Sequence, residues 1–265
     1  MAGDIVKCIG RQVKLFRERA GLTQAQLGEA IGYSEEQVSS VEQGRRVPQP
    51  DFLDAADEAL EAFGVLRAAK EEVANVQLPA FFRGAARLEA QAVEFHAYEN
   101  QVINGLLQTS DYARAVFTMQ RPMLDEETIE QRVTARLARQ ELLTRQPPPV
   151  MSFVTEEAVL LRPCGGTSVM RAQLDHLLRV GQMRNVELQV MPTRLEEHAG
   201  AGGPFALLEP KGRQMMAYAE VQDIGRLLTD RKAVRTLEQR YGIIRAQALP
   251  PRASLEFIEK LRGET

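Results

Sequence analysis

The segment from residue 23 to residue 42 limits what this chain can fold into more than any other part of it. Two short helical patterns meet there around a tight turn. Two helices that cross steeply need a small residue where they touch, and Gly28 supplies it. The turn needs a residue that tolerates positive φ, and Gly32 supplies that. The apolar positions form one buried seam at helical spacing: Leu27, Ile31, Val38 and Val41.

The surrounding sequence predicts a bundle of four or five short helices over the first 65 residues. The turn closes at Tyr33, and Ser34 caps the helix that follows, which leaves its first turn exposed. We expect the helices to cover residues 5–20, 23–31, 35–43 and 52–63. The last of these places apolar residues on one face: Phe52, Leu53, Ala56, Leu60 and Phe63.

This stretch resembles the XRE family of helix-turn-helix regulators, which includes the lambda-type phage repressors. The resemblance covers residues 5–63, with Leu22-Thr23-Gln24 at its opening and Glu42-Gln43-Gly44 at its close. It implies a lambda-repressor-like domain that reads a double-stranded DNA operator. The alternative is a helical hairpin that binds nothing, or that binds another protein.

Geometry and family together suggest which side chains meet DNA. Thr23 and Gln24 begin the second helix, where backbone N–H groups and an amide can hold a phosphate. Gln37 is suited to adenine, and a glutamate to the amine of cytosine. Arg11, Arg45 and Arg46 are phosphate clamps by this hypothesis, although a plain solvated charge explains Arg11 equally well. The full predicted set is Arg11, Thr23, Gln24, Ser34, Glu35, Glu36, Gln37, Ser40, Gln43, Arg45 and Arg46.

The charge distribution supports DNA binding only weakly. The formal net charge is -3, and the basic and acidic groups of residues 1–47 nearly balance. Glu35 and Glu36 stand in reading positions and repel phosphate, so we expect them to favour specificity over raw affinity.

The rest of the sequence predicts an α+β domain with a small sheet. Together with the helical N-terminal domain, it predicts a fold that is mostly α. We expect a helix-turn-helix domain over residues 1–66, a helical connector over 67–90, and an α+β regulatory and dimerisation domain over 91–265. Helices are predicted at 109–119, 125–144, 168–180 and 230–261, the last broken at Pro250-Pro251. Strands are predicted at 150–161, 186–190, 205–208 and 215–221. A glycine-rich loop over 197–203 links two strands, and we expect it to be mobile.

A second resemblance covers residues 85–260. The run from Ile103 to Arg114, with Asn104-Gly105 where the family has Pro-Gly, resembles a signature of actinobacterial regulators that join an XRE domain to a dedicated C-terminal domain. Some of these regulators are antitoxin-like and pair with a small partner protein. From the residues alone, Arg136, Arg139 and Gln140 share one helical face, which is either solvated or binds an acidic partner.

Catalysis, metal binding and cofactors have little support in this sequence. The three histidines are scattered, and Cys164 and His176 lack a second metal-ligand pair. No apolar run approaches the roughly 20 residues of a membrane helix. We therefore expect no enzyme, no cofactor, no metal site and a cytoplasmic location, with the protein on the nucleoid when it is bound to DNA.

The combined hypothesis is a homodimeric, sequence-specific transcriptional regulator. Its C-terminal domain would dimerise, sense a partner protein or small-molecule effector, or do both. The alternative is an antitoxin-like protein that neutralises a small partner protein and binds DNA only to control its own operon.

Overall fold

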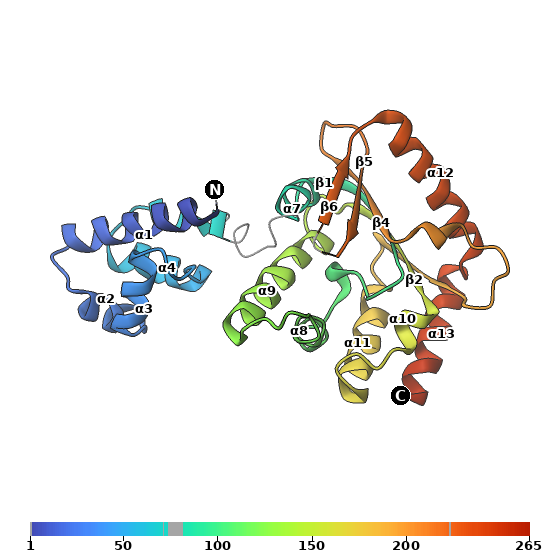
Figure 1. The fold of residues 1–265 in the computed structure, drawn as a ribbon, viewed down its shortest axis with the longest axis horizontal. Coiled ribbons are helices and arrows are strands. Elements are labelled where there is room, and N and C mark those ends of the chain that lie inside the picture. Colours follow the sequence, from blue (N-terminus) through green and yellow to red (C-terminus); the bar gives the residue numbers. More distant parts are fainter. Residues whose placement is uncertain (1, 71, 74–81, 223) are drawn as a thin grey trace. The chain divides into compact units, whose positions relative to one another are not determined.

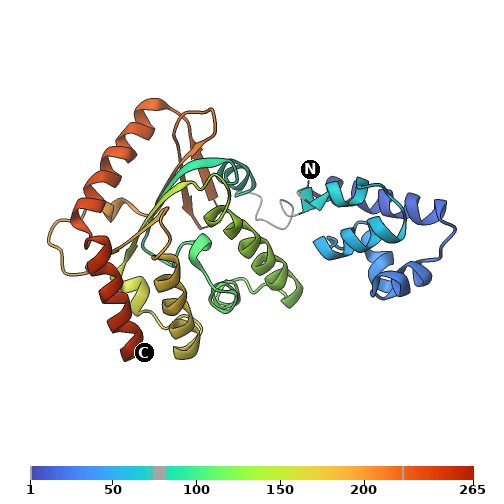
Figure 2. The same ribbon diagram turned by 180° about the vertical axis from the view of Figure 1, so that it is seen from behind.

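A computed structural model describes residues 2–70, 72–73, 82–222 and 224–265 of the chain. They divide into two compact units, residues 1–83 and 84–265 (Figures 1 and 2). The connector expected over residues 67–90 falls partly outside the described residues. Within the described part, no helix is both long and apolar enough to cross a membrane.

The first unit is a bundle of short helices around one apolar core. Its helices are α1 (Ala2–Arg19), α2 (Gln24–Ile31), α3 (Glu35–Glu42), α4 (Pro50–Ala59) and α5 (Val65–Ala68). The predicted seam residues Leu27, Val38 and Val41 are all buried in the core, and Phe52 and Leu53 pack with them. The predicted bundle of four or five short helices is confirmed.

The placement of Phe63 on the buried face of the fourth helix is wrong. Helix α4 ends at Ala59, and Phe63 adopts a left-handed φ of 53° with 85% of its surface exposed. The buried carboxylate of Asp57 fixes this turn, because it accepts hydrogen bonds from the backbone N–H groups of Gly64, Leu66 and Arg67. Leu66, on the short helix that follows, takes the core position instead.

The second unit is built on a mixed sheet with strand order β3-β2-β1-β4-β5-β6. The strands are β1 (Ala92–Glu99), β2 (Val150–Glu156), β3 (Val186–Met191), β4 (Phe205–Pro210), β5 (Met216–Val221) and β6 (Ile224–Leu228). The helices are α7 (Arg83–Glu89), α8 (Ser110–Thr118), α9 (Glu126–Ala138), α10 (Glu157–Leu161), α11 (Thr167–Val180), α12 (Arg231–Gln247) and α13 (Pro251–Glu264). Strand β1 pairs in parallel with β2 and antiparallel with β4.

The α+β class of this unit is confirmed, but its sheet is larger than the four strands predicted. The sequence analysis predicted no strand before residue 150, whereas β1, Ala92–Glu99, lies at the centre of the sheet. The strand was not predicted because polar residues interrupt its apolar ones, so that no apolar run marks it in the sequence. On one face of β1, His96 approaches Tyr241 of α12 and Tyr98 approaches Phe205 of β4. On the other face, Phe95 approaches Phe153.

Two element boundaries and one loop differ from the predictions. Strand β2 ends at Glu156 and gives way to α10, which replaces strand over 157–161. The helix expected over 125–144 ends at Ala138 and tightens into a 3-10 turn, Arg139–Leu143. The loop over 197–203 is held rather than loose. It forms a 3-10 turn, Ala199–Gly202, His198 lies 2.7 Å from the Glu156 carboxylate, and the Ala199 N–H donates to the Gln247 side chain.

Arg136, Arg139 and Gln140 were expected on a solvated face or against an acidic partner. Instead, their side chains contact other residues of the second unit. Arg136 stacks on Phe117 at 4.2 Å and donates to the Gln108 side chain. Arg139 makes two 2.8 Å hydrogen bonds to the buried Glu89 carboxylate. Gln140 donates to the carbonyl of Gln108 at 2.6 Å. These three residues hold the segment around Gly105 in place and do not form a free surface for an acidic partner.

Candidate nucleic-acid interface

The crossing of α2 and α3 depends on a close approach at Gly28. A Cβ at this position would lie 2.5 Å from the carbonyl oxygen of Tyr33, which is closer than real contacts allow. The Tyr33 N–H donates to the Gly28 carbonyl at 2.8 Å, and Gly32 takes the left-handed conformation that closes the turn. The Tyr33 ring then packs edge-on against Phe52. The sequence analysis predicted this local geometry from the two glycines.

Both α2 and α3 begin with a complete capping box. Thr23 Oγ1 accepts from the Gln26 N–H, and Gln26 Oε1 accepts from the Thr23 N–H. Ser34 Oγ accepts from the Gln37 N–H at 3.2 Å, and Gln37 Oε1 accepts from the Ser34 N–H at 2.9 Å. A bidentate contact with adenine needs the amide oxygen as well as the amide nitrogen. With its oxygen in the cap, Gln37 has only the nitrogen to offer as a donor.

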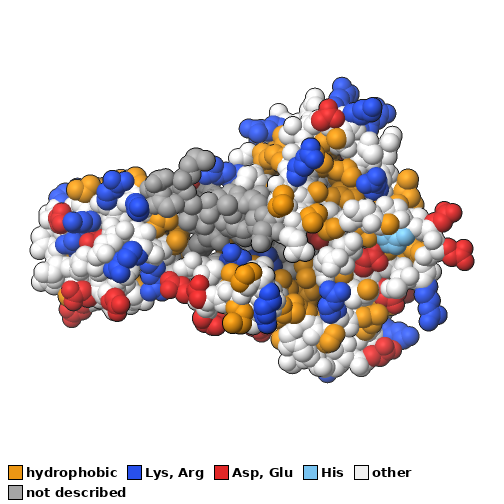
Figure 3. All heavy atoms as spheres, in the orientation of Figure 1, with side chains coloured by type: hydrophobic (Ala, Val, Ile, Leu, Met, Phe, Trp, Pro, Cys, Tyr) orange, Lys and Arg blue, Asp and Glu red, His pale blue; other side chains and the backbone are white. Residues whose placement is uncertain are grey.

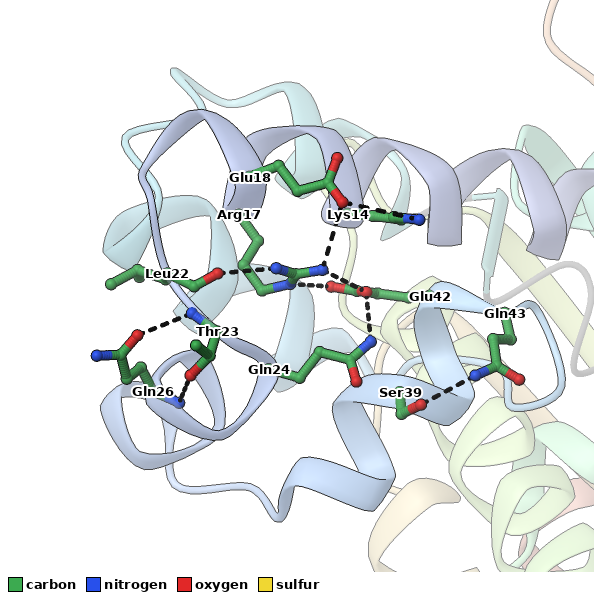
Figure 4. Close-up of polar contacts among 10 residues, drawn as sticks. All are labelled: Lys14, Arg17, Glu18, Leu22, Thr23, Gln24, Gln26, Ser39, Glu42 and Gln43. Carbon is green, nitrogen blue, oxygen red and sulfur yellow. Dashed lines mark hydrogen bonds and ion pairs between the residues drawn. The ribbon is translucent and has the colours of Figure 1, made fainter.

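A buried ion pair ties α1 to the end of α3 (Figure 4). Arg17 Nε lies 2.5 Å from Glu42 Oε1, and Arg17 Nη2 lies 2.9 Å from Glu42 Oε2. The two side chains are only 10% and 2% exposed. Hydrogen bonding to Glu42 raises the pKa of Arg17, so the guanidinium stays charged. Arg17 also donates to the Leu22 carbonyl, directly before the cap of α2.

The same carboxylate fixes Gln24 at the start of α2. Gln24 Nε2 donates to Glu42 Oε2 at 2.7 Å, as Figure 4 shows. The side chain of Gln24, which is predicted to contact a phosphate, is therefore oriented by Glu42 at the end of α3. Glu42 links the two helices that would lie against DNA, and this link extends to α1 through Arg17.

The remaining predicted residues fall into two groups. Ser34, Glu35, Glu36, Gln37 and Ser40 lie on α3 or at its cap. After the helix, Gln43 donates to Ser39 Oγ at 3.0 Å, and the backbone N–H groups of Arg45 and Arg46 donate to the Ser40 carbonyl. Arg11 stands apart on α1, where its Nε donates to the carbonyl of Lys7.

Two residues next to the predicted interface, exposed Lys7 and buried Arg17, escaped the sequence analysis. Lys7 lies against Gly44, where an added Cβ would come within 2.6 Å of Lys7 Cγ, so an exposed lysine joins the loop of Arg45 and Arg46. No local signal predicts a contact between residues so far apart in sequence. Arg17 did carry a signal, because it continues the buried series of Ile9 and Val13 at a spacing of four residues.

The acidic residues of α3 have a local structural role. Glu35 and Glu36 are exposed in its first turn, where negative charge stabilises the helix through its dipole. This matters for a helix of eight residues, which is marginal by itself. In the view of Figure 3, Lys and Arg side chains on the first unit are interspersed with Asp and Glu. Recognition by such a surface depends on positioning more than on net charge.

The second unit contains one arrangement that resembles catalytic chemistry. His96 Nδ1 lies 2.7 Å from Ser152 Oγ, and His96 Nε2 lies 3.4 Å from the Glu94 carboxylate. Ser152 is only 3% exposed, and its hydroxyl also bonds to the buried Tyr241. A nucleophile needs access to substrate, so this cluster is best explained as a polar bridge between the sheet and α12. Among the described residues, no group of three His, Cys, Asp or Glu side chains is placed to hold a metal.

Comparison with known families agrees with this geometry. A helix-turn-helix domain matches residues 9–69, which include α2 to α5, both capping boxes and the ion pair of Arg17 with Glu42. The chain therefore falls in the class of helix-turn-helix regulators. A domain of unknown function, DUF5753, matches residues 82–260, and the protein belongs to that family. No curated protein and no solved structure matches the chain.

Proposed function

We propose that this protein is a sequence-specific transcriptional regulator of the XRE type that binds its operator as a homodimer. Helix α3 would enter the major groove, while the N-terminus of α2 and the loop after α3 hold the flanking phosphates. In this proposal the regulator acts in the cytoplasm, on the nucleoid when it is bound to DNA.

The observation that carries the proposal is the chain of contacts from Arg17 through Glu42 to Gln24. A buried charge pair is costly to desolvate and stabilises little beyond apolar packing. Here it fixes the start of α2 relative to the end of α3, the two points that must meet the DNA backbone together. We therefore attribute the buried Glu42 carboxylate to the positioning of these two points and not to stability.

We further propose that the second unit binds rather than catalyses. It contains about two thirds of the chain, more than dimerisation requires, so it has room for a regulatory partner. A small partner protein or a small-molecule effector would change operator affinity by its preference for one arrangement of the two reading domains. The antitoxin-like alternative differs in that the partner itself would be the target.

The test begins with genomic DNA fragments selected by the full chain. Gln37→Ala is expected to weaken operator binding by on the order of 1–3 kcal/mol while non-specific binding stays nearly unchanged. Because alanine also removes the capping box, Gln37→Glu serves as the matched variant: its carboxylate still caps α3 but cannot donate to a base.

Both variants should lose preference at the same base pair in fluorescence-anisotropy titrations. If Gln37→Glu binds the operator like the original protein, Gln37 acts only through the cap. If no fragment is enriched over bulk DNA, the proposed function is wrong.

A further inference from the structure

The two edge strands of the six-stranded sheet differ in whether another part of the chain covers them. At the β3 edge, the Val190 carbonyl accepts from the Leu249 N–H at 2.9 Å, and the Val190 N–H donates to Ser254 Oγ at 2.9 Å. The side chain of Gln189 also donates to the Leu249 carbonyl. The segment between α12 and α13 therefore covers this edge and blocks further strand pairing.

The β6 edge has no such cover among the described residues. Strand β6 pairs with β5 on one side, and no hydrogen bond of the described structure reaches residues 224–228 from the other. Unpaired edge strands are a template for pairing with another strand, and proteins usually protect them with charge, proline or a covering segment. Residues 224–228 contain one charged side chain, Arg226, and no proline.

Apolar side chains also gather at this open edge. Val221 and Ile224 form the cross-strand pair that closes the β5–β6 hairpin, and they are 70% and 74% exposed. Leu227 lies on the opposite face of the sheet and is 38% exposed. In Figure 1 the two strands lie at one margin of the sheet, away from α13. An open strand edge together with exposed apolar residues on both faces is a surface suited to association.

We propose that β6 pairs antiparallel with β6 of a second copy of this chain, so that two six-stranded sheets become one. Antiparallel pairing of identical strands gives a two-fold axis, in which each copy contributes the same surface. Because the β3 edge is covered, the pairing stops at two copies and cannot extend into a fibre. The choice of occupant rests in part on the proposed function, since a regulator that reads a symmetric operator needs a two-fold dimer.

The charges of β6 are compatible with self-pairing. A register centred on Leu227 places this residue opposite its own copy and Arg226 opposite Leu228. No like charges then face each other within the paired strands. Ile224 would face Asp230 of the second copy, at the end of the paired segment.

The experiment is sedimentation equilibrium on the full chain at micromolar concentration, without DNA. The original protein is expected at twice the chain mass of 29.6 kDa. Ile224→Asp places a carboxylate opposite Asp230 of the second copy, and its mass should fall to 29.6 kDa. Ile243→Asp is the matched control, because Ile243 is also exposed, at 53%, but lies on α12. It should remain dimeric.

A second pair of variants separates lost association from lost folding. Leu227→Lys and Leu227→Glu should each be monomeric alone, and an equimolar mixture should recover the dimer mass. A monomeric original protein overturns the inference, as does a dimer that survives Ile224→Asp, or a mixture that stays monomeric.

The result is distinguishable from that of the operator test. If the protein is monomeric without DNA but still binds a specific operator, sequence-specific binding stands and the β6 interface is wrong. If the dimer forms through β6 but no operator is found, the interface stands and the proposed function is wrong.

Discussion

Replacement of Arg17 by methionine should strongly destabilise the first unit. The substitution leaves the Glu42 carboxylate, 2% exposed, without the partner that holds it at 2.5 and 2.9 Å. Loss of one member of a buried pair costs about 3–5 kcal/mol, because the remaining charge is neither paired nor solvated. A cost of that size is a large fraction of the stability of a small domain.

The double variant Arg17→Met/Glu42→Leu should regain most of this stability, because apolar side chains of similar volume replace the pair. It should not regain operator affinity, since Gln24 has lost the carboxylate that orients it at 2.7 Å. Stability and DNA binding would therefore separate in one protein, which indicates that the ion pair is kept for positioning.

Hydrogen exchange measured by mass spectrometry suits this test, because it reports on peptides of α1 to α4 separately from the second unit. Exchange of the core amides in Arg17→Met should be at least about 100-fold faster, the equivalent of about 3 kcal/mol. Lys14→Gln is the control: it removes an exposed pair, Lys14 with Glu18, where both side chains are 52% exposed. Such a pair is worth about 0–1 kcal/mol.

A cost for Arg17→Met as small as that of Lys14→Gln would refute the reasoning. Recovery of full operator affinity in the double variant would refute the positioning role of Glu42.

Three further predictions concern the crossing, the salt dependence and the pH dependence. Gly28→Ala should lower stability by about 1–3 kcal/mol or more, because its Cβ would lie 2.5 Å from the Tyr33 carbonyl; an unchanged melting temperature of the first unit would contradict the crossing. The slope of log K against log salt for operator binding should be roughly -4 to -8 for a dimer, at about -0.9 per neutralised phosphate; a slope near -12 would mean that the second unit also touches DNA. Burial raises the pKa of Glu99 to about 7, so the folded protein binds a proton more tightly than the unfolded chain does. Stability should therefore fall as pH rises from the ordinary carboxyl range to about 7, by at most about 3 kcal/mol. Glu99→Gln should flatten this part of the curve in chemical denaturation at several pH values; an unaltered pH dependence would show that Glu99 ionises normally.

Much of the first unit could be predicted from sequence because its signals are local. The capping serine and threonine, the two glycines and the seam of Leu27 and Val38 all lie within about 20 residues of one another. Helix periodicity and capping depend on neighbours a few residues away, so both can be recognised in the sequence. The turn at Phe63 was missed because it depends on Asp57, whose carboxylate gives no sign in the sequence of the three N–H groups it binds.

The tertiary structure decided whatever depends on distant partners. Arg17 is basic in the sequence, but only contact with Glu42, 25 residues away, makes it a buried positioning residue. The sequence of β1 contains polar residues that do not indicate a central strand. In the fold it lies between β2 and β4, and its His96 contacts Ser152 and Tyr241. Which edge of the sheet is left open also depends on where α13 packs. The sequence by itself determined the helix-turn-helix, since its residues are mutually local. The fold determined which charges are buried and which edge is free, because burial and pairing are properties of the assembled chain.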